Sequence, residues 1–228
     1  MTGPILAIDT ALAQCAVAVV GQGVRHVIAE PMTKGHAERL PLMAREALQA
    51  VGVEAGELAR VVVVTGPGSF TGVRVGIAFA RGLCIGTAAQ AVGVSSLEAL
   101  AATAGAASEA EATAVVIDAR RGEVFFQVFE NGEELSEPAV ATLEAASTRI
   151  AALADGRAVR LVGSGADLAA PMLASAGLAA IRSGPNVIDV VALAAHGAAL
   201  ATTPDGPRAL YIRSPDATLP PPSPFAPQ

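Results

Sequence analysis

The chain of 228 residues contains no tryptophan and a single tyrosine, Tyr211, and aromatic residues make up 3% of it. Proteins that bind single-stranded nucleic acid stack bases on several aromatic side chains, so this composition argues against such a platform. Positive charge is also scarce, because 15 Lys and Arg residues stand against 21 Asp and Glu residues. A protein that grips a phosphate backbone unaided carries a basic surface. We therefore expect any contact with nucleic acid to be shared with a partner.

Cysteine is nearly absent. The spacing of Cys15 and Cys84 matches no metal-binding or redox motif, and we expect two buried thiols. Residues 1–4 lack a basic start and lead directly into a predicted strand, so no secretion signal is visible and a cytoplasmic protein is expected. Hydrophobic residues make up 52% of the chain and charged residues 16%, which excludes disorder of the whole chain.

One glycine-rich stretch, residues 66–76 (GPGSFTGVRVG), organises the chain. Four valines in residues 60–65 precede it and predict a strand that is buried on both faces. Ser69 or Thr71 can cap the helix that follows. In that helix, small residues recur every four positions and form one stripe: Gly72, Gly76, Ala80 and Cys84. Glycine inside a helix costs about 0.5–1 kcal/mol relative to alanine, so something must approach this face closely.

Three other interpretations fit this stretch less well. A P-loop requires a lysine, and none is present. A dinucleotide fingerprint begins at Gly66 and Gly68, but Thr71 stands where the third glycine belongs. A membrane span fails because Arg74 and Arg81 interrupt a run shorter than the ~20 apolar residues required. Close packing is favoured, and the neighbour can be the protein's own sheet or a helix of another chain.

The predicted elements follow the order strand-strand-strand-helix-strand-helix twice. Strands are predicted at residues 4–9, 15–20, 24–30, 60–65 and 91–94, and again at 113–118, 123–129, 138–141 and 159–162. A last helix is predicted to begin at Ser183 or Asn186 and to end near 200. This pattern predicts an α/β fold duplicated at domain scale, with lobes at residues 1–105 and 106–213 and the last helix able to pack back on the first lobe. The proline-rich residues 214–228 predict a disordered tail.

Polar residues at the predicted turns are candidates for a ligand site. Asp9 and Thr10 follow the first strand, where short polar side chains cap turns or contact a nucleotide phosphate or its metal. The segment 163–165 (GSG) lies before a helix, where a phosphate can bind, although a simple turn is favoured. The segment 118–122 (DARRG) fits a catalytic group or, as favoured, a solvated hairpin.

Two of the histidines have structural interpretations. His36 stands at a helix start, but Leu40 occupies the position four residues on where a second metal ligand belongs, so a cap or a surface residue is expected. His196 lies in an apolar helix and is expected to be a satisfied interior histidine. No catalytic residue and no metal ligand is predicted.

With these segments placed, the chain resembles the bacterial TsaB (YeaZ) family of tRNA threonylcarbamoyladenosine biosynthesis proteins. The matching segments cover the first half of the chain in the family's order: 5–10 (ILAIDT), 36–41 (HAERLP), 66–76, 93–100 (GVSSLEAL) and 118–124 (DARRGEV). A weaker similarity is present at 209–213 (ALYIR).

The resemblance implies an actin-like ATPase fold with two ribonuclease H-like lobes, each a mixed sheet with a meander of three strands plus helices. It implies that this chain acts in a complex with TsaD, the catalytic relative, and with the ATPase TsaE. That complex transfers threonylcarbamoyl to the adenosine beside the anticodon of tRNA. Contact with tRNA is then made only through the complex. ATP or ADP and magnesium belong to the partners or to a shared site, and no cofactor of this chain is implied. TsaD carries an H-x-x-x-H metal pair, and its absence at His36 and Leu40 fits a non-catalytic subunit.

The resemblance also implies that a helix of TsaD covers the small-residue face. The predicted partner-binding residues are Gly72, Val73, Val75, Gly76, Phe79, Ala80 and Leu83. The predicted remnant of a nucleotide site comprises Asp9, Thr10, Gly163 and Gly165. Whether the chain alone forms a homodimer through the same face stays open. The alternative function is a stand-alone ATP-dependent kinase or hydrolase of the same fold; a nicotinamide-dependent oxidoreductase is disfavoured, and a glycoprotease lacks its Ser/His/Asp or metal set.

Overall fold

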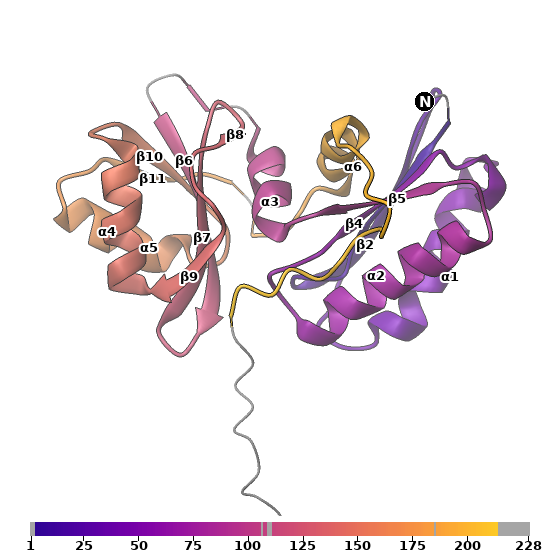
Figure 1. Ribbon diagram of the computed structural model, residues 1–228, viewed down its shortest axis with the longest axis horizontal. Helices are drawn as coiled ribbons and strands as arrows, with labels where there is room; N and C mark the ends of the chain where they lie inside the picture. Colours follow the sequence, from indigo (N-terminus) through magenta and orange to yellow (C-terminus); the bar gives the residue numbers. More distant parts are fainter. Residues whose placement is uncertain (1–2, 106, 109–110, 185, 214–228) are drawn as a thin grey trace, which may run out of the picture.

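The computed structural model describes residues 3–105, 107–108, 111–184 and 186–213, and these form two sheets with helices between and outside them (Figure 1). The first sheet has the strand order β3-β2-β1-β4-β5. Its strands are β1 (Ile5–Asp9), β2 (Gln14–Gly21), β3 (Val24–Pro31), β4 (Arg60–Val64) and β5 (Gln90–Val94). The first three form an antiparallel meander, and β4 and β5 run parallel to β1. These five strands match the five predicted for the first half.

The second sheet has the order β11-β10-β6-β7-β8, and β9 also pairs with β7. Its strands are β6 (Glu111–Arg120), β7 (Glu123–Glu130), β8 (Glu133–Glu134), β9 (Ala139–Thr142), β10 (Ala158–Val162) and β11 (Ala180–Arg182). The two-residue strand β8 has no counterpart in the first sheet. Without it, the order β9-β7-β6-β10-β11 corresponds strand by strand to the order β3-β2-β1-β4-β5 of the first sheet. The duplicated α/β pattern is therefore confirmed, and the chain has the two-lobed actin-like fold.

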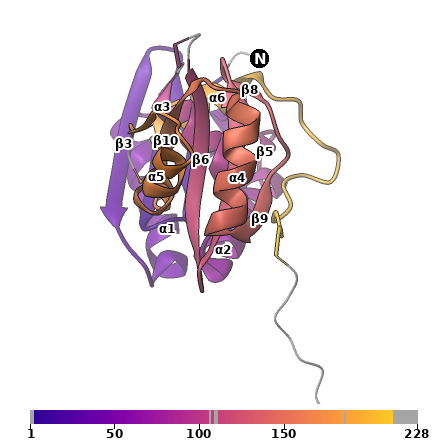
Figure 2. The same cartoon turned by 90° about the vertical axis from the view of Figure 1, so that its left-hand side faces the viewer.

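The helices form three layers around the two sheets (Figure 1), and the view from the second lobe has α4 and α5 in front (Figure 2). Helices α1 (His36–Ala50) and α2 (Phe70–Ile85) cover the outer face of the first sheet, with the 3-10 turn η1 (Ala55–Glu57) after α1. Helices α4 (Leu143–Ala154) and α5 (Ala166–Ser175) cover the outer face of the second sheet. Between the sheets, α3 (Ser96–Ala104) contacts β6 and α6 (Val190–Ala199), and α6 packs on β1 and β2.

Helix α6 begins later than the sequence predicted. It starts at Val190, and the Asp189 side chain caps it by accepting a 2.8 Å hydrogen bond from the Val191 N–H. The Ile188 carbonyl accepts a hydrogen bond from the buried Gln14 side chain, so this residue is anchored outside the helix. The start at Ser183 or Asn186 is therefore wrong. The strand β11 was not predicted, because three residues are too short to show a period; the predicted tail, 214–228, lies outside the described residues.

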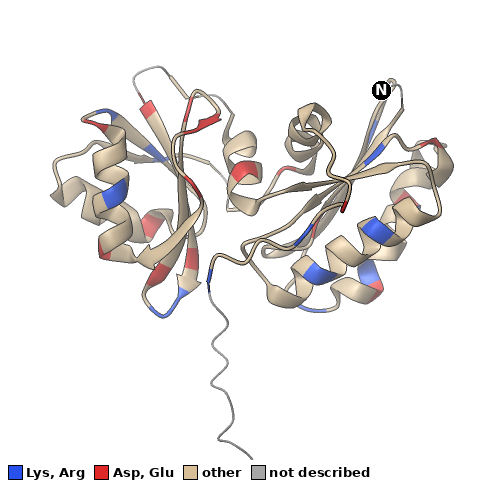
Figure 3. Cartoon of the chain, viewed as in Figure 1, with Lys and Arg blue, Asp and Glu red and all other residues tan. Residues whose placement is uncertain are grey.

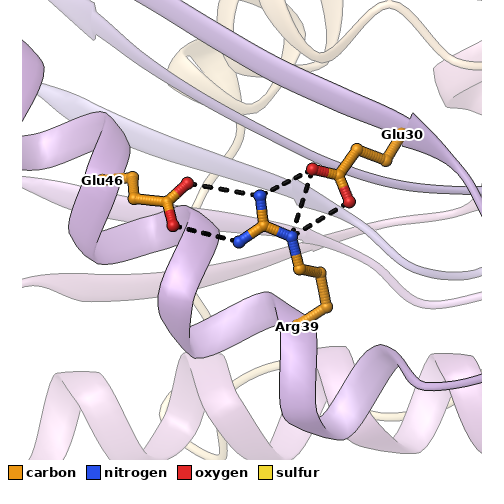
Figure 4. Close-up of polar contacts among 3 residues, drawn as sticks. All are labelled: Glu30, Arg39 and Glu46. Carbon is orange, nitrogen blue, oxygen red and sulfur yellow. Dashed lines mark hydrogen bonds and ion pairs between the residues drawn. The ribbon is translucent and has the colours of Figure 1, made fainter.

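Arg39, within the motif at 36–41, links α1 to the edge strand β3 (Figure 4). Its guanidinium donates to both carboxylate oxygens of Glu30, at 2.6 to 3.1 Å, and to Glu46, about two helical turns further along α1. The hydrogen bonds from Arg39 lower the pKa of the Glu30 carboxyl. The motif therefore has a structural role in the first lobe.

The last described segment connects the two lobes (Figure 1). The Leu210 N–H donates to the Thr65 carbonyl at 2.9 Å, beside the end of β4. Three residues later, Arg213 donates to the Ala119 carbonyl at 3.1 Å and forms an ion pair with Glu123, both in the second lobe. Residues 210–213 therefore form a strap across the space between the lobes, which we call the C-terminal strap.

Candidate functional site

The glycine-rich stretch forms the turn from β4 into α2. Ser69 caps the helix, because its hydroxyl accepts a 3.2 Å hydrogen bond from the Gly72 N–H, and this confirms one of the two predicted caps. The Ser69 N–H donates to the Ala11 carbonyl at 2.7 Å, which ties the turn to the end of β1. A Cβ atom on Gly68 would overlap that same carbonyl. The turn therefore needs glycine because it lies against the backbone of Ala11, just after β1.

The small-residue stripe of α2 packs against the protein's own sheet. A Cβ atom on Gly72 would overlap the Thr10 carbonyl, and one on Gly76 would lie 2.5 Å from the Thr10 hydroxyl and 3.2 Å from Val63 Cγ2. Ala80 is fully buried and Val73 is nearly so. The prediction that Gly72, Val73, Gly76 and Ala80 meet a partner helix is therefore corrected. The close neighbour of this stripe lies within the chain.

Val75, Phe79 and Leu83, the other predicted partner-binding residues, are half-buried on the outer side of α2. Phe79 and Leu83 line a groove of about 590 Å³ between α1 and α2, together with Ala44, Leu48 and the turn after α1. We call the exposed side of these two helices the α1/α2 face. The helices carry most of the Lys and Arg colouring seen on the outer side of the first lobe (Figure 3).

A second stripe of small residues lies exposed on α2. Ala78, Gly82 and Gly86 share the four-residue spacing of the buried stripe, and all three face solvent. No atom lies within 4 Å of a Cβ placed on Gly82. On α1, Leu42 is 42% exposed, and it lies two residues before Ala44, which lines the groove. The sequence analysis did not identify this stripe, although its spacing is equally visible and it also contains two glycines.

The predicted remnant of a nucleotide site is closed at Asp9. The carboxylate is fully buried, and its two oxygens accept hydrogen bonds from the Ala11 N–H at 2.9 Å and from the Gln14 side chain at 2.8 Å. Burial raises the pKa of Asp9 despite these hydrogen bonds. Thr10 is also fully buried, and its hydroxyl donates to the Gly72 carbonyl. The turn-capping interpretation is therefore the correct one for Asp9. Neither the Asp9 nor the Thr10 side chain has a solvent-accessible oxygen that could contact a metal or a phosphate.

Gly163 and Gly165 repeat this arrangement in the second lobe. A Cβ atom on Gly163 would lie 2.5 Å from the Val116 carbonyl, and one on Gly165 would lie 2.7 Å from Val116 Cγ1. The Gly165 N–H donates to the Val116 carbonyl at 2.9 Å. The turn from β10 into α5 therefore packs on β6 as the turn from β4 into α2 packs on β1. The glycines serve this packing, as the simple-turn interpretation predicted.

The segment 118–122 forms the hairpin between β6 and β7. Asp118 accepts a 2.8 Å hydrogen bond from the Arg120 N–H and pairs with the same arginine's guanidinium at 3.2 Å. Arg120, Arg121 and Gly122 all have positive φ angles, between 56° and 78°, as a tight hairpin turn requires. The favoured hairpin interpretation is confirmed.

The histidines and cysteines differ in part from expectation. His36 is buried, not at the surface, and its Nε2 lies 3.2 Å from the Gln14 carbonyl. His196 is only half-buried, and its Nε2 lacks a hydrogen-bond partner among the described residues, lying 3.7 Å from a Glu98 carboxylate oxygen, so the interpretation as a satisfied interior histidine is wrong. Cys15 is buried, which raises its pKa to about 11, whereas Cys84 is only partly buried. Among the described residues, no three His, Cys, Asp or Glu side chains are grouped so that they could hold a metal ion.

A groove of about 700 Å³ lies between the lobes, and we call it the strap groove. Its lining comes from the turn 66–68, the first turns of α2, Phe125 of β7 and residues 210–213. Phe70 and Tyr211 are each 59% exposed there, with their ring centres 6.2 Å apart. The Arg74 guanidinium lies 3.5 Å from the Phe70 ring centre and donates to the Tyr211 hydroxyl at 3.0 Å.

The fold and these contacts define a two-lobed actin-like protein whose Asp9 turn is closed and whose α1/α2 face is open. A family model described as TsaD: tRNA N6-adenosine threonylcarbamoyltransferase matches residues 22–198, and the chain belongs to this family. None of the described helices has the length and apolar character that crossing a membrane requires.

Within the family, the similarity to TsaB (YeaZ) proteins is confirmed. The TsaB of Escherichia coli (strain K12) is 36% identical over 129 residues, which cover 57% of this chain and 56% of that protein. The TsaB of Haemophilus influenzae is 37% identical over 122 residues, which cover 54% of this chain and 52% of that protein. The chain thus spans about half the length of the curated relatives it matches.

Two solved structures from Pseudomonas aeruginosa share the fold over most of the chain. An uncharacterized protein with similarity to peptidase YEAZ superimposes with a TM-score of 0.76 at 27% identity, covering 93% of this chain and all of that chain. YeaZ superimposes with a TM-score of 0.70 at 28% identity, covering 87% of this chain and 93% of that chain.

Proposed function

We propose that this chain acts in tRNA threonylcarbamoyladenosine biosynthesis as a non-catalytic subunit that binds and activates TsaD. The names of the TsaB relatives support the process. The closed turn at Asp9 supports a non-catalytic role, because both carboxylate oxygens already accept hydrogen bonds from the chain itself. In this proposal TsaE is the second protein partner, and tRNA is contacted through the complex.

The α1/α2 face is the proposed binding surface for TsaD. Ala78 and Gly82 are exposed and leave room for a helix backbone to approach α2. The neighbouring groove, lined by Phe79 and Leu83, offers apolar area beside that contact line. Burial of apolar area contributes about 25 cal/mol per Å², so a helix of the partner laid along this face would gain affinity from the groove as well as from the close approach. The exposed stripe is the single observation that carries the proposal.

The test compares two identical substitutions on two different helices. Ala78→Leu places a large side chain on the α1/α2 face, and Ala145→Leu places the same side chain on α4 of the second lobe, where Ala145 is also exposed. Binding to purified TsaD is measured by calorimetry. We expect Ala78→Leu to abolish binding and Ala145→Leu to leave it unchanged, with both variants folded as judged by circular dichroism. Equal binding by both variants would remove the α1/α2 face from the proposal.

Activation is tested separately in a reconstituted reaction. TsaD, TsaE, the adenylate-forming enzyme and tRNA are supplied throughout, and threonylcarbamoylated tRNA is measured with and without this chain. We expect product only when the chain is present. Product formation that does not depend on the chain would refute the supporting role, and the isolated chain would then be assayed for ATP turnover as a kinase or hydrolase.

A further inference from the structure

We propose that the strap groove is the docking site for the proline-rich segment 219–227 of this same chain. The groove has the character of a surface that takes an extended peptide. Phe70 and Tyr211 are the exposed aromatic side chains of its lining, and Pro67, Val73 and Phe125 supply further apolar lining. Aromatic-lined grooves of this kind bind polyproline II segments, because such segments are extended before binding and lose little conformational entropy.

The segment 219–227 has the matching composition. Its sequence is LPPPSPFAP, with two overlapping P-x-x-P spacings, at residues 221–224 and 224–227. Six of the chain's 15 prolines lie within residues 214–228. Proline rings pack against aromatic rings, and Phe225 offers an aromatic side chain that can pack against the same surface. The chain thus carries both the groove and a ligand of the type that the groove fits.

The position of the segment favours docking within one molecule. The strap ends at Arg213, which itself lines the groove, so residue 214 begins at the groove's edge. Five residues, 214–218 (SPDAT), separate Arg213 from the proline-rich segment, and they can span at most about 17 Å. Their Ser-Pro-Asp order is typical of a β-turn, with Pro in the second position. A reversal there would return the segment along the groove, and tethering would raise its effective concentration to the millimolar range.

Charge is complementary as well. Arg74 lines the groove with its guanidinium stacked on Phe70, whereas the charge of Arg213 is already offset by its ion pair with Glu123. The segment between Arg213 and the prolines carries one acidic residue, Asp216, and residues 214–228 contain no basic residue. The α1/α2 face proposed for TsaD is built from later turns of α2, at Ala78 and Gly82, so docking in the groove and binding of TsaD are separate properties.

The chain provides its own reporter for a test. Because there is no tryptophan and Tyr211 is the only tyrosine, ultraviolet fluorescence of the full chain comes from the groove. Acrylamide quenching of this fluorescence is compared between the wild-type chain and a full-length tail variant carrying Pro220→Ser, Pro221→Ser, Pro222→Ser and Pro224→Ser. We expect a higher quenching constant for the tail variant, because Tyr211 is no longer covered. Thr218→Ala, which keeps every proline, is the matched control and should quench like wild type.

A peptide of residues 214–228 provides the second measurement. Added to the tail variant, it should lower the quenching constant in a saturable way, and it should not do so in the tail variant that also carries Phe70→Ala. Equal quenching of the wild-type chain and the tail variant would overturn the proposal. Protection of Tyr211 that disappears when the wild-type chain is diluted would also overturn it, because the groove would then be occupied by the tail of a second copy.

Discussion

The hydroxyl of Thr10 donates a 2.7 Å hydrogen bond to the carbonyl of Gly72 and so joins the end of β1 to the first turn of α2. In the second lobe, the Gly165 N–H donates to the Val116 carbonyl at 2.9 Å and joins the start of α5 to β6. The two lobes therefore use the same device, in which glycine lets a helix start lie against the neighbouring strand. The glycines of both turns are explained by the fold, without a bound phosphate.

The two stripes of α2 predict opposite effects of adding a methyl group. Gly76→Ala places a Cβ against the Thr10 hydroxyl and should lower the free energy of unfolding by about 1–3 kcal/mol, as overpacking does. Gly82→Ala meets open space and should raise it by about 0.5–1 kcal/mol, because alanine favours the helix. Urea denaturation of both variants measures the difference. Shifts in the same direction would contradict the assignment of buried and exposed faces.

Thr10→Val removes the hydrogen bond to Gly72 with little change of shape. We expect a loss of about 1–2 kcal/mol in the free energy of unfolding, since the bond is fully buried. Thr71→Val, one residue before Gly72 and exposed, is the control and should change it by less than about 0.5 kcal/mol. Thermal unfolding of the three proteins tests this. An unchanged Thr10→Val variant would show that the bond contributes nothing to α2 docking.

Arg60 fastens the end of α6 to the first sheet. Its side chain is buried, and one guanidinium nitrogen donates to the carbonyls of Gly197 and Leu200, each at 2.7 Å. A lysine ammonium is more strongly hydrated than a guanidinium and therefore costlier to bury, so Arg60→Lys should lower the free energy of unfolding by about 1–2 kcal/mol. Hydrogen exchange should rise selectively in α6. The same change at the exposed Arg45 is the control, and equal effects at both positions would contradict this role.

Glu98 predicts a pH-dependent contribution to stability. Burial raises its pKa, but the nearby His196 imidazole, 3.7 Å away, and hydrogen bonding with Ser95 outweigh this, and the net pKa is lowered. A lowered pKa means that ionised Glu98 stabilises the fold above the unfolded value near 4.5, and that this stabilisation is lost as the pH falls through the folded pKa.

Glu98→Gln keeps a side chain that can complete the capping box with Ser95 while removing the charge. We expect it to lower the free energy of unfolding by up to about 1 kcal/mol at pH 7, and to match the wild-type chain once Glu98 is protonated in both states. Urea denaturation across this pH range measures both. A difference that persists unchanged into acid would show that the charge is not its origin.

Much of the fold was readable from local patterns. The valines of β4, the hairpin turns and the Ser69 cap act over a few residues, so their signals are contained in short windows of sequence. The start of α6 was misplaced because the Gln14 contact that holds Ile188 outside the helix joins residues 174 positions apart, whereas the Asp189 cap is a local signal that the analysis overlooked. His36 was misplaced for the same reason, since its burial depends on the carbonyl of Gln14 on β2.

By itself, the sequence determined the duplicated order of elements, the family motifs and the presence of a small-residue stripe on α2, because each is a period or a spacing along the chain. Which side of α2 turns inward was decided only by the tertiary structure. Gly72-Gly76-Ala80 and Ala78-Gly82-Gly86 have the same spacing, and nothing local separates them. Thr10 and Val63 lie under the first stripe because β1 and β4 pair in one sheet, and that pairing leaves the second stripe open to a partner.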